Sequence, residues 1–483
     1  MKQAKGTPRR MTRRGALQVL GGGAASAVLA ATASRRPAVA QAGRPKKPNV
    51  LFIAVDDLNC RLGCYGYPYM KTPSIDRLAK QGVRFDHAHC QFALCNPSRS
   101  SLLTGRRPDT TKVLNNSAKF RDALPDVVTL AQHFQQNGYW LARTGKIYHG
   151  GIEEPLGWDV MEDNPGVPPE LRAKAKMVAE GGKLEPPAPP AGAPGRAQRA
   201  QAGGVPLVWR SMSGPDEAQG DGQIALKGLE FLKQRPKDKP FFIAVGFHKP
   251  HLPFVAPSKY FELYDPATIK VWSRPPGTPP SRWNEGVSDD VAQGLIAAYF
   301  ACISFMDAQV GKLLDALDEA KLADDTLIVF WGDNGYHLTE HGRWRKSTLY
   351  EVSARVPLIV AAPGAKSGVA CPRLVEFVDI YPSLAELCGL PAPAGVEATS
   401  FAPLMSDPQR AWKKAAFTRN SNGHTVRTDR WRYMELLDSS GQELYDEQND
   451  PDELKNLATD PKAAETLKQL QEMLRKGWQA ALP

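Results

Sequence analysis

Two apolar runs, each followed closely by carboxylate or amide side chains, constrain the fold of this chain most. The runs span residues 50–55 and 327–331, and the polar side chains after them are Asp56, Asp57, Asp333 and Asn334. A short, uninterrupted apolar run is typical of a strand that is buried on both faces, as in a parallel sheet. Because ligands of open α/β sheets bind at the carboxyl ends of the strands, the sequence predicts an α/β fold with an oxygen-rich site at that edge.

Helical and strand-like segments alternate along most of the chain, which favours a layered α/β architecture. Helices are expected near 73–79, 128–136 and 223–232, and further strands at 139–142 and 241–247. After residue 395 the pattern changes to four short strand-like segments and a polar helix, which predicts a small antiparallel sheet covered by a helix. We therefore expect a catalytic domain over residues 43–395 and a C-terminal subdomain over residues 396–483.

A Pro-, Ala- and Gly-rich insertion interrupts this alternation at residues 163–218. Two proline clusters lie within it, at 164–169 and 185–190. Such a composition is typical of irregular segments, so we expect a partly disordered surface loop. Its end, from Trp209 to Asp221, is expected to return toward the rim of the site.

The first 42 residues have the pattern of a targeting segment rather than of a folded element. Arg13 and Arg14 precede a weakly apolar stretch, and small-residue cleavage sites follow at 38–42. This twin-arginine (Tat) pattern predicts export through the Tat machinery to the periplasm or the extracellular space. Without the segment, which carries eight Lys/Arg and no Asp/Glu, the net charge falls from +10 to +2. We therefore expect no nucleic-acid partner, and the glycine-rich stretch is too weakly apolar for a stable membrane anchor.

The sequence Cys95-Asn96-Pro97-Ser98-Arg99 has the features of a reactive site. Because proline lacks an amide hydrogen and suits the first turn of a helix, Cys95 is expected at a helix N-terminus. Backbone N–H groups and the positive end of the helix dipole favour anions there, and Arg99 follows one turn later. A cysteine without such neighbours would be interpreted as a buried structural thiol. That is our interpretation of most of the other cysteines.

The polar side chains after the two apolar runs form a candidate metal site. Asp56, Asp57, Asp333 and Asn334 bring together three carboxylates and one carboxamide. Oxygen ligands of this kind suit a hard divalent cation such as Ca²⁺ or Mg²⁺. One acidic pair after a strand is more often part of a turn. Two such pairs at strand ends of one sheet favour a metal site.

Basic side chains follow other apolar strands or the same strand loops. They are Lys146 with His149, His248 with His251, and Lys346 beyond the second acidic loop. Each of these residues alone could be a solvated loop residue or could cap or pack locally. Their joint occurrence at one sheet edge favours an anion-binding site with groups for acid–base catalysis.

Together these motifs resemble the signature of the formylglycine-dependent type I sulfatases, Cys-x-Pro-Ser-Arg with Thr-Gly further on, here Thr104-Gly105. The resemblance implies an alkaline-phosphatase-like fold, with a large, mostly parallel mixed sheet flanked by helices. It implies one Ca²⁺ per chain, held by Asp56, Asp57, Asp333 and Asn334 together with the modified Cys95. It also implies that a formylglycine-generating enzyme converts Cys95 to formylglycine, whose hydrated form attacks the sulfur of a sulfate ester.

The same resemblance assigns roles to the basic side chains. Arg99 would hold the modified Cys95, and Lys146 would bind it or the sulfate. His149 would take a proton from the modified residue. His248 and Lys346 would face the leaving oxygen, as acid and as sulfate clamp. His251 is a further substrate-binding candidate, and the carboxylate of a uronic acid would be held by Lys346, His251 or Arg432.

Three segments, at 63–66, 103–111 and 244–254, are similar to those of iduronate-2-sulfatases within the family. This similarity implies a sulfated saccharide substrate and, more finely, a 2-O-sulfated uronic acid. The insertion and much of the C-terminal subdomain depart from the family pattern. Two alternatives stay open: a phosphodiester or phosphonate ester hydrolase of the same fold, and a non-catalytic glycan-binding protein whose Cys95 is never oxidised.

Overall fold

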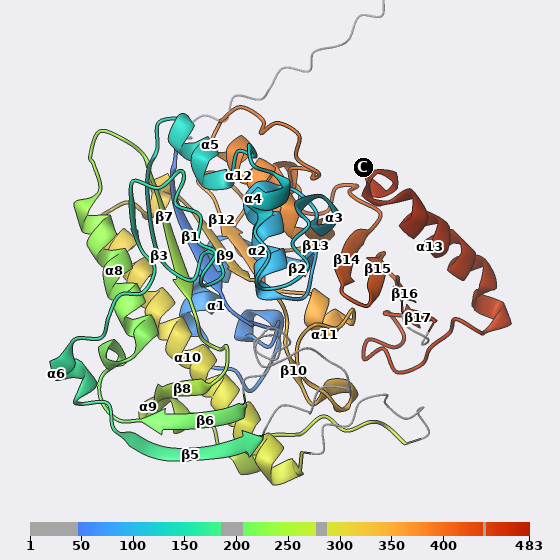
Figure 1. Cartoon of the computed structure of the whole chain (residues 1–483), viewed down its shortest axis with the longest axis horizontal. Coiled ribbons are helices and arrows are strands. Elements are labelled where there is room, and N and C mark those ends of the chain that lie inside the picture. The colour runs from blue at the N-terminus through green and yellow to red at the C-terminus, as the bar shows by residue number, and fades with distance from the viewer. Residues whose placement is uncertain (1–46, 185–205, 277–286, 438–440) are drawn as a thin grey trace, which may run out of the picture. The chain divides into compact units, whose positions relative to one another are not determined.

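An eight-stranded mixed sheet forms the centre of the protein (Figure 1). The computed structural model describes residues 47–184, 206–276, 287–437 and 441–483, and the expected Tat segment lies outside them. The strands, in spatial order, are β13 (Val369–Glu376), β2 (Val83–His89), β12 (Leu358–Ala361), β9 (Thr326–Gly332), β1 (Asn49–Val55), β7 (Phe241–Phe247), β3 (Trp140–Gly145) and β4 (Val160–Glu162). Only β12 is antiparallel to its neighbours within this sheet, so the predicted mostly parallel α/β architecture is confirmed.

Helices cover both faces of the central sheet (Figure 1). On one face lie α1 (Pro73–Gln81), α8 (Gly220–Gln234) and α10 (Asp289–Glu319), and on the other α2 (Cys95–Thr104), α5 (Leu130–Gln136) and α12 (Ile380–Leu387). Every second residue of β1, beginning with Leu51, packs in the first layer, and the residues between, beginning with Val50, pack in the second. Because both faces are covered, the β1 sequence is apolar almost throughout instead of alternating.

Helix α10 is not predicted by the sequence patterns above. Twenty of its 31 residues are buried, so it lacks the broad polar face by which a surface helix is recognised. Within the described part of the chain it is the one helix long and apolar enough to cross a membrane. However, 78% of its most apolar stretch is buried inside the protein. It packs beside α8 (Figure 1) as a core helix.

The expectation of an irregular loop over residues 163–218 is wrong for two segments of the insertion. Strand β5 (Met177–Leu184) pairs antiparallel with β6 (Leu207–Met212), and β6 pairs parallel with β8 (Phe254–Pro257). The Trp209 ring on β6 packs against Phe261, at a centroid distance of 5.5 Å. This packing comes from a distant part of the chain, and the local composition carries no sign of it. Residues 185–205 lie outside the described part.

The C-terminal subdomain has the predicted architecture, a four-stranded antiparallel sheet covered by a helix. Its elements are β14 (Ala416–Asn420), β15 (Gly423–Arg427), β16 (Trp431–Leu436), β17 (Gln442–Asp446) and α13 (Ala464–Lys476). Residues Gly43–Pro483 form one compact unit. Thr418 of β14 donates a hydrogen bond to the carbonyl of Cys90, which links the subdomain to the segment just before α2.

A short hairpin and several single-turn helices connect these elements. The hairpin pairs β10 (His337–Leu338) with β11 (Trp344–Arg345). The short helices are α3 (Pro108–Thr111), α4 (Phe120–Ala123), α6 (Pro169–Arg172), α9 (Ser258–Phe261) and α11 (Glu351–Ala354), and the 3-10 turns are Gly63–Tyr65, Asp216–Ala218, Pro266–Thr268, Ala323–Asp325, Glu340–Gly342, Phe377–Asp379, Ala402–Met405, Pro461–Ala463 and Trp478–Ala481. The hairpin matters most for the site, because Lys346 follows it directly.

Candidate active site

Cys95 is the first residue of α2, as the sequence predicts. The helix ends at Thr104 because Gly105 adopts a left-handed conformation, with φ of +64°, that favours glycine. Cys95 is 1% exposed. Its thiol lies 3.2 Å from Asp56 Oδ1 and accepts a hydrogen bond from Lys346 Nζ at 2.9 Å. The helix N-terminus therefore presents Cys95 to an acidic group and a basic group at once.

Three carboxylates meet Cys95 at the carboxyl ends of β1 and β9. One ligand atom from each of Asp56, Asp57, Cys95 and Asp333 lies within 4.8 Å of the others. The Asp57 amide donates to Asp333 Oδ1 at 3.0 Å, and Asn334 Nδ2 donates to Asp57 Oδ1 at 2.9 Å. Strands β1 and β9 pair in register, so both end at the same level. The two strand ends therefore lie next to each other, as the sequence predicts.

This donor set fits a hard divalent cation. Besides the carboxylates it offers Asn334 Oδ1, which is buried and has no hydrogen-bond partner among the residues that the structure describes. A buried acceptor without a donor costs free energy unless a ligand satisfies it. Carboxylate and amide oxygens are the ligands that Ca²⁺ and Mg²⁺ take. Asp56, Asp57, Asp333 and Asn334 are therefore placed to coordinate such a cation.

Three cationic side chains surround the carboxylates. Arg99 Nε donates to Asp333 Oδ2 at 2.8 Å, and its Nη2 atom lies 3.9 Å from Asp56 Oδ1 without a hydrogen bond to any described residue. Lys146 Nζ donates to Asp56 Oδ2 at 2.5 Å, and Lys346 Nζ donates to an oxygen of Asp57. Glycine sets the position of Lys146: Gly145 turns with φ of +70°, and the Lys146 amide then donates to the carbonyl of Gly246 at 2.7 Å. The loop after β3 is thereby joined to the end of β7.

The electrostatics of the cluster follow from this arrangement. Burial alone would raise the pKa of Asp56, but Lys146 and other nearby cations hold it well below its usual range. Burial, partly opposed by Arg99, raises the pKa of Asp333 to about 6. Burial, together with the neighbouring carboxylates, raises the pKa of the Cys95 thiol well above its usual range. At neutral pH the unmodified thiol is therefore protonated, unlike the thiolate that a cysteine nucleophile requires.

A cavity of about 250 Å³ opens beside this cluster. It brings together four of the predicted basic residues, Lys146, His149, His248 and His251, over Asp56. Its other described walls are Gly145, Tyr148, Gly150, Glu153, Asp163 and Asn164. The predicted residues therefore form two layers, a buried cluster around Cys95 and a set of basic groups lining the cavity.

The cavity histidines differ in their surroundings. Burial, and then the charge of Lys146, lower the pKa of His149 to about 4, so its ring is neutral at pH 7. His251 Nδ1 lies 2.6 Å from the carbonyl oxygen of Leu252, which can only accept, so this nitrogen carries a proton. Its Nε2 atom lies 3.7 Å from Asp57 Oδ2. The neutral ring of His149 can therefore accept a proton. The ring of His251 is held in place by a carbonyl group of its own loop.

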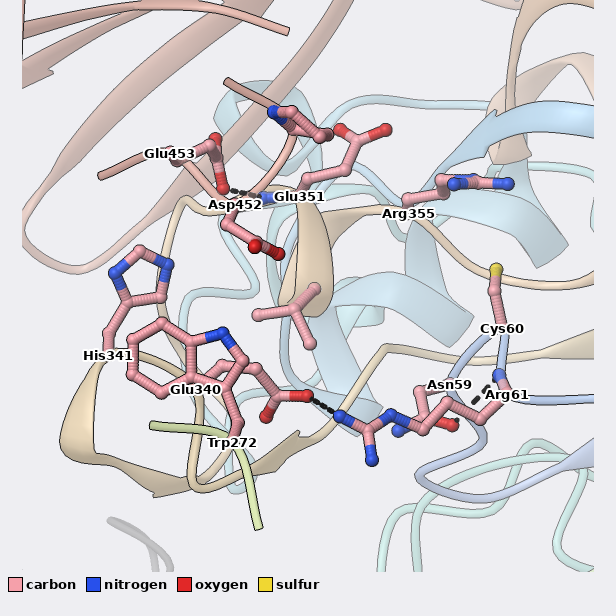
Figure 2. Close-up of a pocket in the computed structure, with 12 residues that line it drawn as sticks. Asn59, Cys60, Arg61, Trp272, Glu340, His341, Glu351, Arg355, Asp452 and Glu453 are labelled. Atoms are coloured by element: carbon pink, nitrogen blue, oxygen red, sulfur yellow. Dashed lines mark hydrogen bonds and ion pairs between the residues drawn. The ribbon is translucent and has the colours of Figure 1, made fainter. Parts of the chain in front are cut away.

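A second cavity, of about 270 Å³, contains none of the predicted site residues (Figure 2). Trp272 and His341 form one wall, with their rings stacked at a centroid distance of 5.9 Å. Arg61 forms an ion pair with Glu340 across its floor, as the dashed line in Figure 2 shows. Although slightly larger, this cavity lacks Cys95 and the carboxylate cluster, and we assign the chemistry to the first cavity.

One predicted substrate contact is wrong. Arg432, a candidate for holding a uronate carboxylate, is completely buried in the C-terminal subdomain. Its guanidinium contacts Glu447 at 2.9 Å and Glu453 at 2.7 Å, and it also pairs with Glu351. An arginine held by three carboxylates cannot also bind a ligand. Sequence patterns do not reveal these partners, because they lie in α11 and after β17, far from Arg432 in the chain or in another element.

One residue beside the site was not predicted to act there. Asp221, in the first turn of α8, contacts the loop that carries His248. Of the segment 209–221, which was expected to return toward the rim of the site, Asp221 contacts this loop, and none of the segment's residues lines the cavity. The only sequence feature that could have indicated a role for Asp221 is its position at the start of a helix. Acidic residues are too common there for this feature to be specific.

Comparisons with known proteins place this geometry in a family. The sequence model described as Sulfatase matches residues 48–390, and the model described as N-sulphoglucosamine sulphohydrolase, C-terminal, matches residues 339–480. A "Sulfatase" of Formosa agariphila is 34% identical over 89% of this chain and 87% of its own. The iduronate 2-sulfatase of Mus musculus is 32% identical over 73% of this chain and 71% of its own. A protein solved with its substrate D-glucosamine-2-N,6-O-disulfate has the same fold, with a TM-score of 0.71 and 21% identity over 90% of this chain and 98% of its own.

Proposed function

The chain belongs to the sulfatase family and is a sulfuric ester hydrolase, and we propose that it removes sulfate from a sulfated glycan with modified Cys95 as the nucleophile. The observation that carries this proposal is the position of Cys95. It lies at a helix N-terminus, against the carboxylate cluster and within 2.9 Å of Lys346 Nζ. A nucleophile, a metal site and anion-binding groups meet there, which is what the transfer of a sulfuryl group requires.

Two groups that the chain does not encode complete the chemistry. Conversion of Cys95 by a formylglycine-generating enzyme supplies a hydrated aldehyde oxygen as the nucleophile in place of a protonated thiol. A Ca²⁺ ion on Asp56, Asp57, Asp333 and Asn334, when bound, supplies positive charge to the oxygens of the sulfate. The remaining tasks belong to side chains of the protein itself.

Those tasks divide between the buried cluster and the cavity. Lys146, Lys346 and Arg99 hold negative charge that develops on the oxygens around sulfur. His149, which is neutral at pH 7, accepts a proton from the modified Cys95. His248 gives a proton to the leaving oxygen when the S–O bond breaks and that oxygen takes the bonding electron pair.

The sugar is the finer part of the proposal. The similarity to iduronate 2-sulfatase supports a 2-O-sulfated uronic acid as the first substrate to test. Arg432 is excluded by burial, and Lys346 is buried against Asp57 and Cys95. His251, which lines the cavity, is therefore the candidate for holding the uronate carboxylate. Glu153 and Asp163 also line the cavity, and the position of the uronate must keep its carboxylate away from them.

Sulfate release from a panel of glycosaminoglycan-derived oligosaccharides tests the reaction. Cys95→Ser serves as the blank, because a serine hydroxyl cannot return to an aldehyde and release sulfate; we expect no repeated turnover from it. Mass analysis of the Cys95 peptide should show formylglycine. Sustained turnover by Cys95→Ser, or an unmodified thiol in active protein, would overturn the proposed nucleophile. Faster hydrolysis of an aryl phosphodiester than of every sulfate ester would favour the phosphoester alternative.

Removal of the metal tests the carboxylate cluster. After chelation we expect sulfate release to fall and to recover when Ca²⁺ is added back. Full activity after verified removal of divalent cations would contradict the proposed role of Asp56, Asp57, Asp333 and Asn334.

Export is a separate proposal that the N-terminal pattern supports. We expect replacement of both Arg13 and Arg14 by lysine to leave the protein in the cytoplasm, as measured by cell fractionation. Unchanged export of that variant would contradict the Tat assignment.

A further inference from the structure

A buried carboxylate lies behind His248. Asp221 is 3% exposed and belongs to the first turn of α8, and His248 follows the last residue of β7. Asp221 Oδ1 accepts a hydrogen bond from the His248 amide at 3.0 Å, and Oδ2 accepts one from the Lys249 amide at 2.8 Å. Oδ1 also lies 3.5 Å from Nδ1 of the His248 ring. One carboxylate therefore contacts both the backbone and the ring of the same residue.

The loop that begins at His248 is held at a second point. The Lys249 ammonium donates to the carbonyl of His251 at 3.0 Å and to that of Pro253 at 2.7 Å. Asp221 fixes the start of the loop and Lys249 spans its remainder. The position of His248 is thus set by side chains that do not line the cavity.

The contact with the ring also decides which nitrogen faces the substrate. An ionised carboxylate can only accept, so the nitrogen beside it, Nδ1, carries a proton. Nε2 lies on the opposite side of the ring and is left for the cavity that His248 lines.

We propose that Asp221 is a positioning residue that holds His248 so that Nε2–H points at the leaving oxygen. The inference rests on the proposed function, in which His248 is the acid. In that step the leaving oxygen gains the proton of Nε2 and the electron pair of the S–O bond. The ring becomes neutral and keeps the Nδ1 proton directed toward Asp221.

A matched control exists elsewhere in the same core. Asp307 of α10 is 2% exposed, and it accepts hydrogen bonds from two consecutive amides, those of Ser74 at 3.1 Å and Ile75 at 2.8 Å. It resembles Asp221 in burial and in its backbone contacts, but the structure gives it no contact with a histidine. Asp307→Asn therefore reports the structural cost of losing such a carboxylate.

The test uses two sulfate esters that differ in their need for an acid. A sugar sulfate leaves as an alkoxide and requires a proton, whereas 4-nitrophenyl sulfate leaves as a stable phenolate and requires little help. We expect Asp221→Asn to lower kcat/KM for the sugar sulfate by about 100-fold, the size typical of a misplaced catalytic group. The loss for 4-nitrophenyl sulfate should be much smaller. Asp307→Asn should lower the thermal midpoint and leave the ratio of the two kcat/KM values unchanged.

A double-variant cycle separates this proposal from the one it rests on. In a His248→Gln background, Asp221→Asn should cause no further loss on the sugar sulfate, because the residue acts through the ring. An equal loss on both esters, or full additivity in the cycle, would show that Asp221 is only structural. If His248→Gln leaves the ratio of the two esters unchanged, His248 is not the acid, and the proposed function fails at that point together with the role of Asp221.

A conservative variant keeps the test decisive if Asp221→Asn does not fold. Asp221→Glu retains the charge and both acceptor oxygens but displaces them by one methylene group. We expect it to fold and to give a ratio between those of the wild type and His248→Gln. A wild-type ratio in folded Asp221→Glu would mean that the ring needs no exact placement, which would overturn the proposal.

Discussion

Two of the buried clusters of opposite charges in the described part of this protein invite comparison, and we propose a catalytic role for only one of these two. The catalytic cluster consists of Asp56, Asp57 and Asp333 with Arg99, Lys146 and Lys346. The structural cluster consists of Glu376 and Asp379 with Arg107 and Lys413. All of these residues are buried except Lys146, which lines the cavity. Burial and charge alone therefore do not distinguish a site from a structural element.

The carboxylates of the structural cluster are held in place by bidentate and backbone hydrogen bonds. Arg107 donates to both oxygens of Glu376, at 2.7 and 2.8 Å, and the amide of Phe417 donates to one of them at 3.0 Å. Lys413 Nζ lies 2.7 Å from both oxygens of Asp379. Arg107 and Lys413 lower the pKa of Glu376, although burial opposes them. Bidentate and backbone contacts of this kind fix a geometry permanently.

The catalytic cluster depends instead on the ends of two lysine side chains. Lys146 and Lys346 approach Asp56 and Asp57 from the cavity side and from the hairpin loop. Asn334 Oδ1 has no donor in the described part of the chain. Flexible cations and an unsatisfied acceptor can exchange partners with an incoming metal ion and sulfate. The lesson is that exchangeable partners, rather than buried charge, mark the site.

The largest effect should follow from a change in the catalytic cluster. Asp57→Asn keeps an acceptor for Asn334 Nδ2 but removes one negative charge from the metal site. We expect kcat/KM for a sulfate ester to fall by at least about 1,000-fold, because charge stabilisation of the transition state is lost. Because Asp56 and Asp333 also stabilise the charge of Lys346, the thermal midpoint should change little. Near-normal turnover of Asp57→Asn would contradict the proposal that the first cluster acts in catalysis and the second only in stability.

The opposite result is expected from the structural cluster. Lys413→Met leaves Glu376 and Asp379 without a shared cation, and breaking a buried pair in this way costs about 3–5 kcal/mol of unfolding free energy. Urea unfolding measures this loss, and kcat/KM of the folded variant should equal that of the wild type. Lys414→Met, at the neighbouring exposed position, is the matched control and should change neither quantity. A stable Lys413→Met variant with impaired catalysis would contradict the structural role.

The parts of the fold that sequence predicts are those with a local cause. Strands β1, β7 and β9 are apolar because they are buried on both faces, and their bounds agree with the predicted ones to within a residue or two. The same pattern located Asp56 and Asp333, since the polar residues come directly after the strands. Cys95 was predicted at a helix start because Pro97 is compatible with a first helical turn.

The parts that sequence does not predict depend on contacts between distant segments. Strand β6 is ordered by pairing with β8, and Arg432 is neutralised by Glu351, 81 residues away in sequence. Asp221 lies 27 residues before the histidine that it contacts. In each case the local sequence is compatible with more than one structure or role. The contact that decides between them comes from a segment that only the folded chain brings near.

A smaller effect should come from a buried group that carries no charge at all. His337 is 0% exposed; its Nδ1 donates to the carbonyl of Glu340 at 3.1 Å, and its Nε2 accepts from Thr348 Oγ1 at 2.8 Å. Burial lowers the pKa of His337 to about 3. Between pH 6.5 and 3 the unfolded chain therefore binds a proton that the folded chain does not, so stability falls as the pH is lowered through this window.

His337→Gln should remove this proton while keeping a donor and an acceptor. Urea unfolding at pH 7 and pH 5 measures the difference: we expect the wild type to lose about 2 kcal/mol more than the variant. The other histidines titrate alike in both proteins and cancel. His337 does not line the cavity, and its hydrogen bonds go to Glu340 and Thr348 rather than to Lys146 or Lys346. Because glutamine can keep both hydrogen bonds, we expect kcat of the variant at pH 7 to be unchanged. An equal loss of stability in both proteins would show that a buried neutral group contributes nothing to the acid sensitivity, and that the charged clusters account for all of it.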